Sequence, residues 1–303
     1  MGFLSGIVSG ISKVASFVGT TVSKAVSGAF KVASATLSSL ATTGGFIGSI
    51  ATGANKLLGM ASAFMAGSLG SIVGPIIGDL VIQAIGKAVS WVAKKIGIVK
   101  EDDKVDEIGY RLEEASKHED WEKREVFGSF SEYHEYLKEK IPDSEIDQKK
   151  LKENRIGYTS LGISVLKDGI GTKLGLDIPI DFLIEIGKCK LDGSELNALL
   201  NEFSAKSHDL SLFRQYLKGE LRGNMRRAVE DSIFNALKSI YPEKSDESLR
   251  VQISSMREVA RDDSKILQNY ESELESLKNK DQMSQTAEDV PKVVNLEKGG
   301  KLS

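Results

Sequence analysis

The strongest chemical pattern in the sequence is a run of four basic residues at a spacing of four: Arg214, Lys218, Arg222 and Arg226. On one helix, residues four apart lie on the same face, so these side chains would form a basic stripe. Such a stripe binds phosphate groups, which predicts a polyanionic partner: nucleic acid, a nucleotide or an anionic lipid. The alternative is a solvated face paired with Glu220 and Glu230, with Gly219 and Gly223 breaking the helix.

A second charge pattern is acidic. Asp177, Asp181 and Glu185 also follow one another at a spacing of four. Acidic residues at the start of a helix interact favourably with its dipole. We therefore interpret them as part of a helix start rather than as a ligand site.

The patterns typical of catalytic and metal sites are incomplete in this sequence. The three histidines are scattered, and His134-Glu135 lacks the second histidine of a zinc protease motif. The segment 168–173 lacks the spacing of a phosphate-binding loop. Cys189 lies between two lysines, which would lower its thiol pKa, but no general base lies near it in the sequence. We predict that the protein is not an enzyme and holds neither a metal ion nor a cofactor.

Charge and glycine content divide the chain near residue 100, so any functional site must be built from segments of two different kinds. Residues 1–100 contain eight lysines, no arginine and one acidic residue, Asp79, for a net charge of +7. The remaining residues carry a net charge of −10, and 16 of the 29 glycines lie in the first hundred residues. Segments this different are not expected to share one core.

The start of the chain has the pattern of a membrane-interface helix. Apolar residues recur at helical spacing from Leu4 to Phe30, opposite a face of Ser, Thr, Gly and Lys. A short repeat with an offset of eleven residues places Lys13 under Lys24. A long helix with an apolar stripe and opposing lysines suits the bilayer surface. The segment 42–45 (Thr-Thr-Gly-Gly) predicts a break in the helical structure.

The most apolar segment is 57–78, which lies between Lys56 and Asp79 and contains no charge. As a helix it would be ~33 Å long, about the thickness of the hydrocarbon core of a bilayer. Apolar residues continue to Trp91, and Lys94 and Lys95 follow. An aromatic residue with a basic flank is typical of an interfacial anchor.

Small residues form three lines at a spacing of four in this region: Gly2, Gly6 and Gly10; Gly59, Ala63 and Gly67; Gly70, Gly74 and Gly78. Such a line leaves a groove in which a second helix can approach closely in lipid. Glycine inside a helix otherwise costs about 0.5–1 kcal/mol relative to alanine. The lines therefore predict helix packing between protomers of a homo-oligomer, with a kink at Pro75.

The rest of the chain favours a soluble helical domain over 101–280 and a disordered polar tail over 281–303. We expect helical segments over 101–126, 132–140, 144–170 and 225–240, among others. Ser129, Asp192 and Ser245 each resemble helix-capping residues, and Pro142 and Pro242 end helices.

The sequence thus predicts an all-α protein with Gly/Ala/Ser-rich membrane-active helices in 1–100. The leading hypothesis is a pore-forming, membrane-permeabilising oligomer: a toxin, an injected effector or an antiviral-defence effector. Its partners would be a lipid membrane, further copies of itself, and a chaperone, inhibitor or phage or secretion component. The alternative is a virion or secretion-machine protein that holds its apolar N-terminus against partners. The start lacks the pattern of a secretory signal peptide, and a single cysteine fits a reducing cytoplasm or injection as the route to the membrane.

Overall fold

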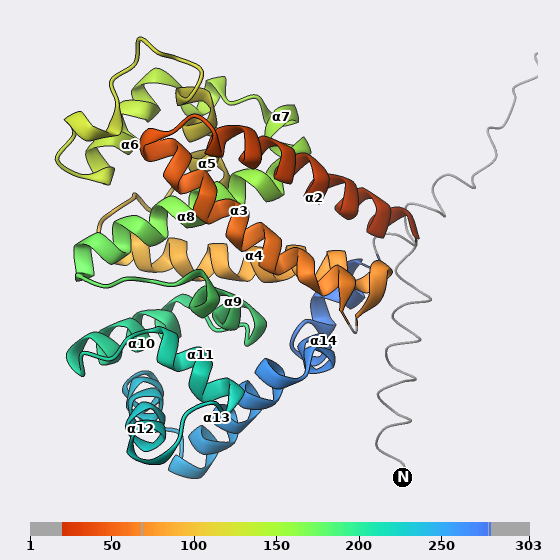
Figure 1. The fold of residues 1–303 in the computed structure, drawn as a ribbon, viewed down its shortest axis with the longest axis vertical. Coiled ribbons are helices and arrows are strands. Elements are labelled where there is room, and N and C mark those ends of the chain that lie inside the picture. The colour runs from red at the N-terminus through yellow and green to blue at the C-terminus, as the bar shows by residue number, and fades with distance from the viewer. Residues whose placement is uncertain (1–19, 68, 278, 280–303) are drawn as a thin grey trace, which may run out of the picture.

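The computed structural model describes residues 20–67, 69–277 and 279, and this part of the chain is helical with no strand (Figure 1). The helices of the N-terminal third are α2 (Thr20–Ala41), α3 (Gly45–Ala66) and α4 (Gly70–Lys95). The α-helices that follow are α5 (Val105–Ala115), α6 (Phe130–Lys140), α7 (Gln148–Glu153), α8 (Arg155–Leu174), α9 (Ile180–Lys188), α10 (Gly193–Ala205), α11 (Ser211–Lys218), α12 (Gly223–Ile240), α13 (Asp246–Arg261) and α14 (Ile266–Asn269). Short 3-10 helices are η1 (Arg124–Val126), η2 (Asp143–Glu145) and η3 (Asp263–Lys265). The prediction of an all-α fold is confirmed.

Helix α4 runs through the middle of the molecule. Helices α2, α3 and α8 pack on one side of it, and α9 and α10 pack on the other (Figure 1). Its buried residues include Ile76, Ile77, Ile82, Ile85 and Val89, which point in different directions around the helix, so more than one face contacts protein. A helix covered from several sides has an apolar surface all round rather than one apolar stripe.

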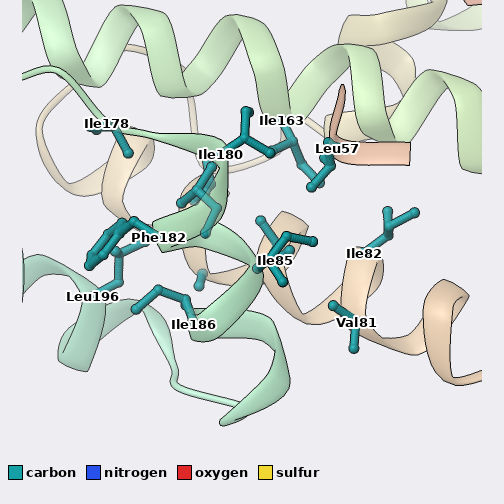
Figure 2. Packing of buried hydrophobic residues seen from close by; sticks show 14 of the residues in the cluster. Leu57, Val81, Ile82, Ile85, Ile163, Ile178, Ile180, Phe182, Ile186 and Leu196 are labelled. Carbon is teal, nitrogen blue, oxygen red and sulfur yellow. The ribbon is translucent and has the colours of Figure 1, made fainter. Parts of the chain in front are cut away.

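One hydrophobic core crosses the division at residue 100, so the expectation of two separate cores is wrong. Leu57 and Val81 from the first hundred residues belong to the same buried cluster as Ile163 and Phe182 (Figure 2). Helix α4 carries few charges because other helices surround it. Apolar periodicity records burial and does not distinguish burial in protein from burial in lipid.

Several helices begin or end where the sequence predicts. Ser129 caps α6 by accepting a hydrogen bond from the Glu132 backbone N–H, and Asp192 and Glu195 form a full capping box at α10. Ser245 caps α13 by the same kind of bond. The predicted break at 42–45 is confirmed, since α2 ends at Ala41 and α3 begins at Gly45.

The predicted membrane-length helix over 57–78 is wrong, because the chain turns within it. Helix α3 ends at Ala66, and Gly67 adopts an extended conformation. Gly70 has a φ of +71°, a left-handed conformation that glycine adopts without steric cost, and α4 starts there. The glycines at 67 and 70 therefore make a turn between two antiparallel helices.

The predicted helix over 101–126 is shorter than expected. Only Val105–Ala115 is α-helical, with a 3-10 turn at Arg124–Val126. Trp121 lies between them and packs against the core.

Candidate membrane-insertion site

Helix α4 is the one helix in the described part of the chain that is long and apolar enough to cross a membrane. It has 26 residues and a window of mean hydropathy 1.6, of which 78% is buried inside the protein. Its length of ~39 Å exceeds the ~30 Å hydrocarbon core of a bilayer. The core helix of a water-soluble protein meets the same criteria, so contacts around α4 decide what the helix can do.

The single acidic residue of the first hundred, Asp79, lies inside α4 and is paired with the second part of the chain. Arg155 at the start of α8 donates from Nη2 to both carboxylate oxygens of Asp79, at 2.9 and 2.7 Å. Gln83, one turn further along α4, donates to Asp79 Oδ2 at 3.0 Å. The side chain of Asp79 is 12% exposed and that of Arg155 is 39% exposed. The charge within the apolar helix is thus neutralised by a residue that belongs to another helix.

Glycines let α4 approach its neighbours closely on two sides. A Cβ at Gly78 would lie 2.8 Å from the Ala61 carbonyl oxygen of α3. On the opposite side, a Cβ at Gly187 of α9 would lie 2.9 Å from the Val81 carbonyl oxygen. Real Cβ contacts are longer, so each glycine is required by close backbone packing. The small-residue spacing at Gly78 therefore serves contact within the protomer.

The three predicted lines of small residues have different surroundings. Gly2, Gly6 and Gly10 lie outside the described residues. Gly74 and Gly78 are buried in α4, and Gly70 is the first residue of that helix. Gly59 and Ala63 are exposed along α3, Gly67 follows that helix in the α3–α4 turn, and no atom lies within 4 Å of a Cβ built at Gly59. The exposed line on α3 is available for a contact that the folded protomer does not use.

The predicted interface residues lie on the surface. Lys24 is exposed on α2, and Lys13 lies outside the described residues. Trp91 is 39% exposed near the end of α4, and the Lys95 ammonium lies 4.8 Å from its ring centroid. Lys94 donates to the Glu101 carbonyl oxygen at 2.6 Å. Trp91 and Lys95 border an open hollow of about 540 Å³ against α10 and α12.

The predicted basic stripe does not form, because two helices share its residues. Helix α11 ends at Lys218, Gly219 is left-handed with a φ of +78°, and α12 begins at Gly223. The Arg222 guanidinium donates a hydrogen bond to the Gly219 carbonyl oxygen at 2.9 Å, and Arg226 Nε lies 3.9 Å from Glu230 Oε2. The expected phosphate-binding face is therefore replaced by local pairing, as the alternative interpretation predicted.

The acidic and basic patterns instead meet at one buried carboxylate. Glu185 of α9 is 3% exposed, and Arg214 and Lys188 lie 3.9 and 4.0 Å from its two oxygens. Its Oε2 accepts no hydrogen bond. Burial raises the pKa of Glu185 despite the nearby cations. Burial and the neighbouring Lys188 ammonium lower the pKa of Lys218. Burial thus disfavours the charged form of both side chains.

The charged cluster around Glu185 extends to the turn between α3 and α4. Asp263 of η3 accepts from Lys188 at 2.9 Å. The Lys188 ammonium lies 6.0 Å from the ring centroid of Phe64 in α3. A Cβ at Gly67 would lie 4.0 Å from Asp263 Oδ2. The cluster thus contacts the tip of the α3–α4 pair.

The lowered thiol pKa expected for Cys189 from its two lysine neighbours is wrong. Burial and the Glu185 carboxylate raise the pKa of its thiol, and these effects outweigh the neighbouring Lys188. Its Sγ lies 3.8 Å from the Met256 carbonyl oxygen. The thiol is thus held in its unreactive protonated form.

The remaining sequence candidates show no assembled chemistry. The segment 168–173 belongs to α8 and forms no loop. His134 is buried beside Asp103, which also accepts from Lys138 at 2.7 Å. Among the described residues, no group of three His, Cys, Asp or Glu side chains could hold a metal ion.

Sequence reasoning missed the partners of the two buried carboxylates. A lone acidic residue in an apolar helix signals that a cation must lie near it, since an unpaired buried charge is strongly unfavourable. The signal identifies Asp79 but cannot select Arg155, which is 76 positions away.

Comparison with protein-family models, curated proteins and solved structures finds no match for this chain.

Proposed function

We propose that this protein inserts the α3–α4 hairpin (residues 45–95) into a membrane and assembles there into an oligomeric pore. The observation that carries the proposal is the position of α4: a helix that is long and apolar enough to span a membrane lies buried in the centre of the folded protein. The folded protomer would then be the storage form, and the inserted hairpin the active form.

The energetics of burial make a membrane necessary for this change. Each buried Leu, Ile or Val side chain contributes about 1.5–3 kcal/mol relative to exposure to water. Exposing the eight buried Val and Ile residues of α4 to water would cost about 12–24 kcal/mol, which is comparable to or larger than the ~5–15 kcal/mol stability of a typical domain. In lipid these side chains remain in an apolar environment, so insertion avoids most of that penalty.

Three further features support the proposal. Residues 1–100 carry a net charge of +7, which attracts anionic lipid surfaces. Trp91, Lys94 and Lys95 stand at the end of α4, where an inserted helix would reach the interface. The exposed small-residue line of α3 offers a contact between hairpins of neighbouring protomers.

Release of a trapped dye from liposomes tests the proposal. Purified protein is added to vesicles that contain phosphatidylglycerol and to vesicles of phosphatidylcholine alone, with a pH series and limited proteolysis as activating treatments. We expect leakage from the anionic vesicles. Protein that neither binds nor permeabilises them under any treatment contradicts the proposal, and recovery of the protein in stoichiometric amounts from purified virus particles would favour a structural role instead.

A further inference from the structure

The chain after α13 crosses helix α9 and docks there with its own apolar stripe. We call residues 263–277 the C-terminal strap. Its side chains Ile266, Tyr270 and Leu274 follow one another at a spacing of four and are at most 3% exposed. In Figure 1 this blue segment leads from α13 past α9 toward the turn between α3 and α4.

The polar contacts of the strap concentrate on the end of α9. The Tyr270 hydroxyl donates to the Gly187 carbonyl oxygen, and Asn269 Nδ2 donates to the Lys188 carbonyl oxygen at 3.0 Å. The last carbonyl groups of a helix have no partner within it. The strap therefore supplies donors that cap α9.

Lys190, just after α9, binds the strap although its own backbone is in an unfavourable conformation. Its φ is +54°, in a left-handed position where glycine is preferred. Its ammonium donates to the Asn269 carbonyl oxygen at 3.1 Å and lies 2.6 Å from the Glu273 carboxylate. Glycine at this position would relieve the strain but could not bind the strap.

The same helix-ending motif occurs after α10 without such a contact. Ser207 has a φ of +52°, and the backbone N–H of the next residue, His208, donates to the Phe203 carbonyl oxygen. After Lys190, the backbone N–H of Leu191 donates to the Ile186 carbonyl oxygen in the same way. Among the described residues, the Ser207 side chain makes no hydrogen bond. Ser207 is therefore a matched control for the backbone strain at Lys190.

The strap reaches the hairpin by two routes. Through α9, it acts on Gly187, which packs against Val81 and Ile85 of α4. Through Asp263, it pairs with Lys188 above the Phe64 ring of α3. Displacement of the strap would loosen α9 and uncover the tip of the hairpin together.

We propose that the C-terminal strap is an autoinhibitory element that keeps the hairpin folded against α9 until the strap is displaced. This inference rests on the proposed function for its biological meaning. The physical coupling of strap to hairpin is measurable without a membrane, so the two can fail separately.

The test compares the full-length variants Lys190→Gly and Glu273→Gln with Ser207→Gly. Hydrogen exchange in solution is measured for the strap, α9 and α4, and dye leakage is measured with phosphatidylglycerol vesicles. We expect both strap variants to raise exchange in all three segments and to accelerate leakage about fivefold, the factor that corresponds to ~1 kcal/mol. Ser207→Gly, which only relieves backbone strain, should raise neither the exchange nor the leakage.

Two results would overturn the autoinhibitory role. One is faster exchange in the strap with unchanged exchange in α4; the other is exchange or leakage in Lys190→Gly equal to that in Ser207→Gly. If exchange in α4 rises in the strap variants while no protein permeabilises vesicles, the strap controls the hairpin but the pore-forming function is wrong.

Discussion

Arg155 on α8 binds both carboxylate oxygens of Asp79 through a single nitrogen, Nη2, at 2.9 and 2.7 Å. The pair joins the only acidic residue of the first hundred to the later part of the chain. Insertion of α4 into lipid requires this pair to separate, so it is a point at which the folded form resists the proposed change.

Arg155→Gln is expected to destabilise the folded protein, because Asp79 would keep its burial and lose its cation. Breaking a fully buried pair costs about 3–5 kcal/mol, and the partial exposure of Arg155 reduces the expected loss to about 1–3 kcal/mol. Urea unfolding measures it, with Lys152→Gln, at an exposed position three residues earlier, as the control.

The double variant Asp79→Asn/Arg155→Gln removes both charges and should recover most of the loss. A double variant as unstable as Arg155→Gln alone would mean that the arginine acts through packing and not through the charge of Asp79.

Glu185→Gln is expected to stabilise the protein at neutral pH by about 1–3 kcal/mol, because burial disfavours the carboxylate charge that the substitution removes. The Lys188, Arg214, Lys218 and Asp263 side chains surround this carboxylate. Thermal unfolding at pH 7 measures the effect, and Glu258→Gln, at an exposed position on α13, is the control.

The same carboxylate gives a pH dependence of defined sign. Because burial raises the pKa of Glu185, the folded state binds its proton more tightly than the unfolded state does. The contribution of Glu185 to stability is therefore favourable in acid and is lost as the pH rises from its ordinary pKa of 4.5 through the raised value. This slope should disappear in Glu185→Gln; an unchanged slope would assign it to other groups.

Gly59→Leu is expected to leave the folded protomer intact and to impair assembly in the membrane. No neighbour lies within 4 Å of a Cβ at Gly59, whereas a leucine would fill the groove of the exposed small-residue line. Leakage should fall about tenfold or more, which corresponds to ~1.4 kcal/mol, while vesicle binding stays the same.

The control for this substitution is Gly28→Leu, at an exposed position on α2 that also has no neighbour within 4 Å. Equal effects of the two substitutions, or equal loss of binding and leakage in Gly59→Leu, would contradict a packing role for α3.

The local features of this fold could be predicted from sequence, and the long-range ones could not. Helix starts can be predicted at Ser129, Asp192 and Ser245, because capping depends only on residues up to three positions away. The spacing of Gly78 indicates close packing but not that its neighbour is Ala61 of the same chain. The basic residues at 214–226 fail as a stripe because Gly219 turns the chain, and the sequence alone left both outcomes open.

If the protein acts on a membrane through its α3–α4 hairpin, that hairpin must leave α8, and a disulfide between the two can test this step directly. A Cβ at Gly53 of α3 would lie 3.8 Å from the Ser164 Cβ of α8, which matches the usual Cβ separation of a disulfide. The variant Gly53→Cys/Ser164→Cys is oxidised, and dye leakage is compared before and after reduction, with Gly53→Cys alone as the control. We predict no leakage from the oxidised double variant and full recovery on reduction. Equal leakage from the oxidised and reduced forms would mean that the hairpin acts without leaving α8.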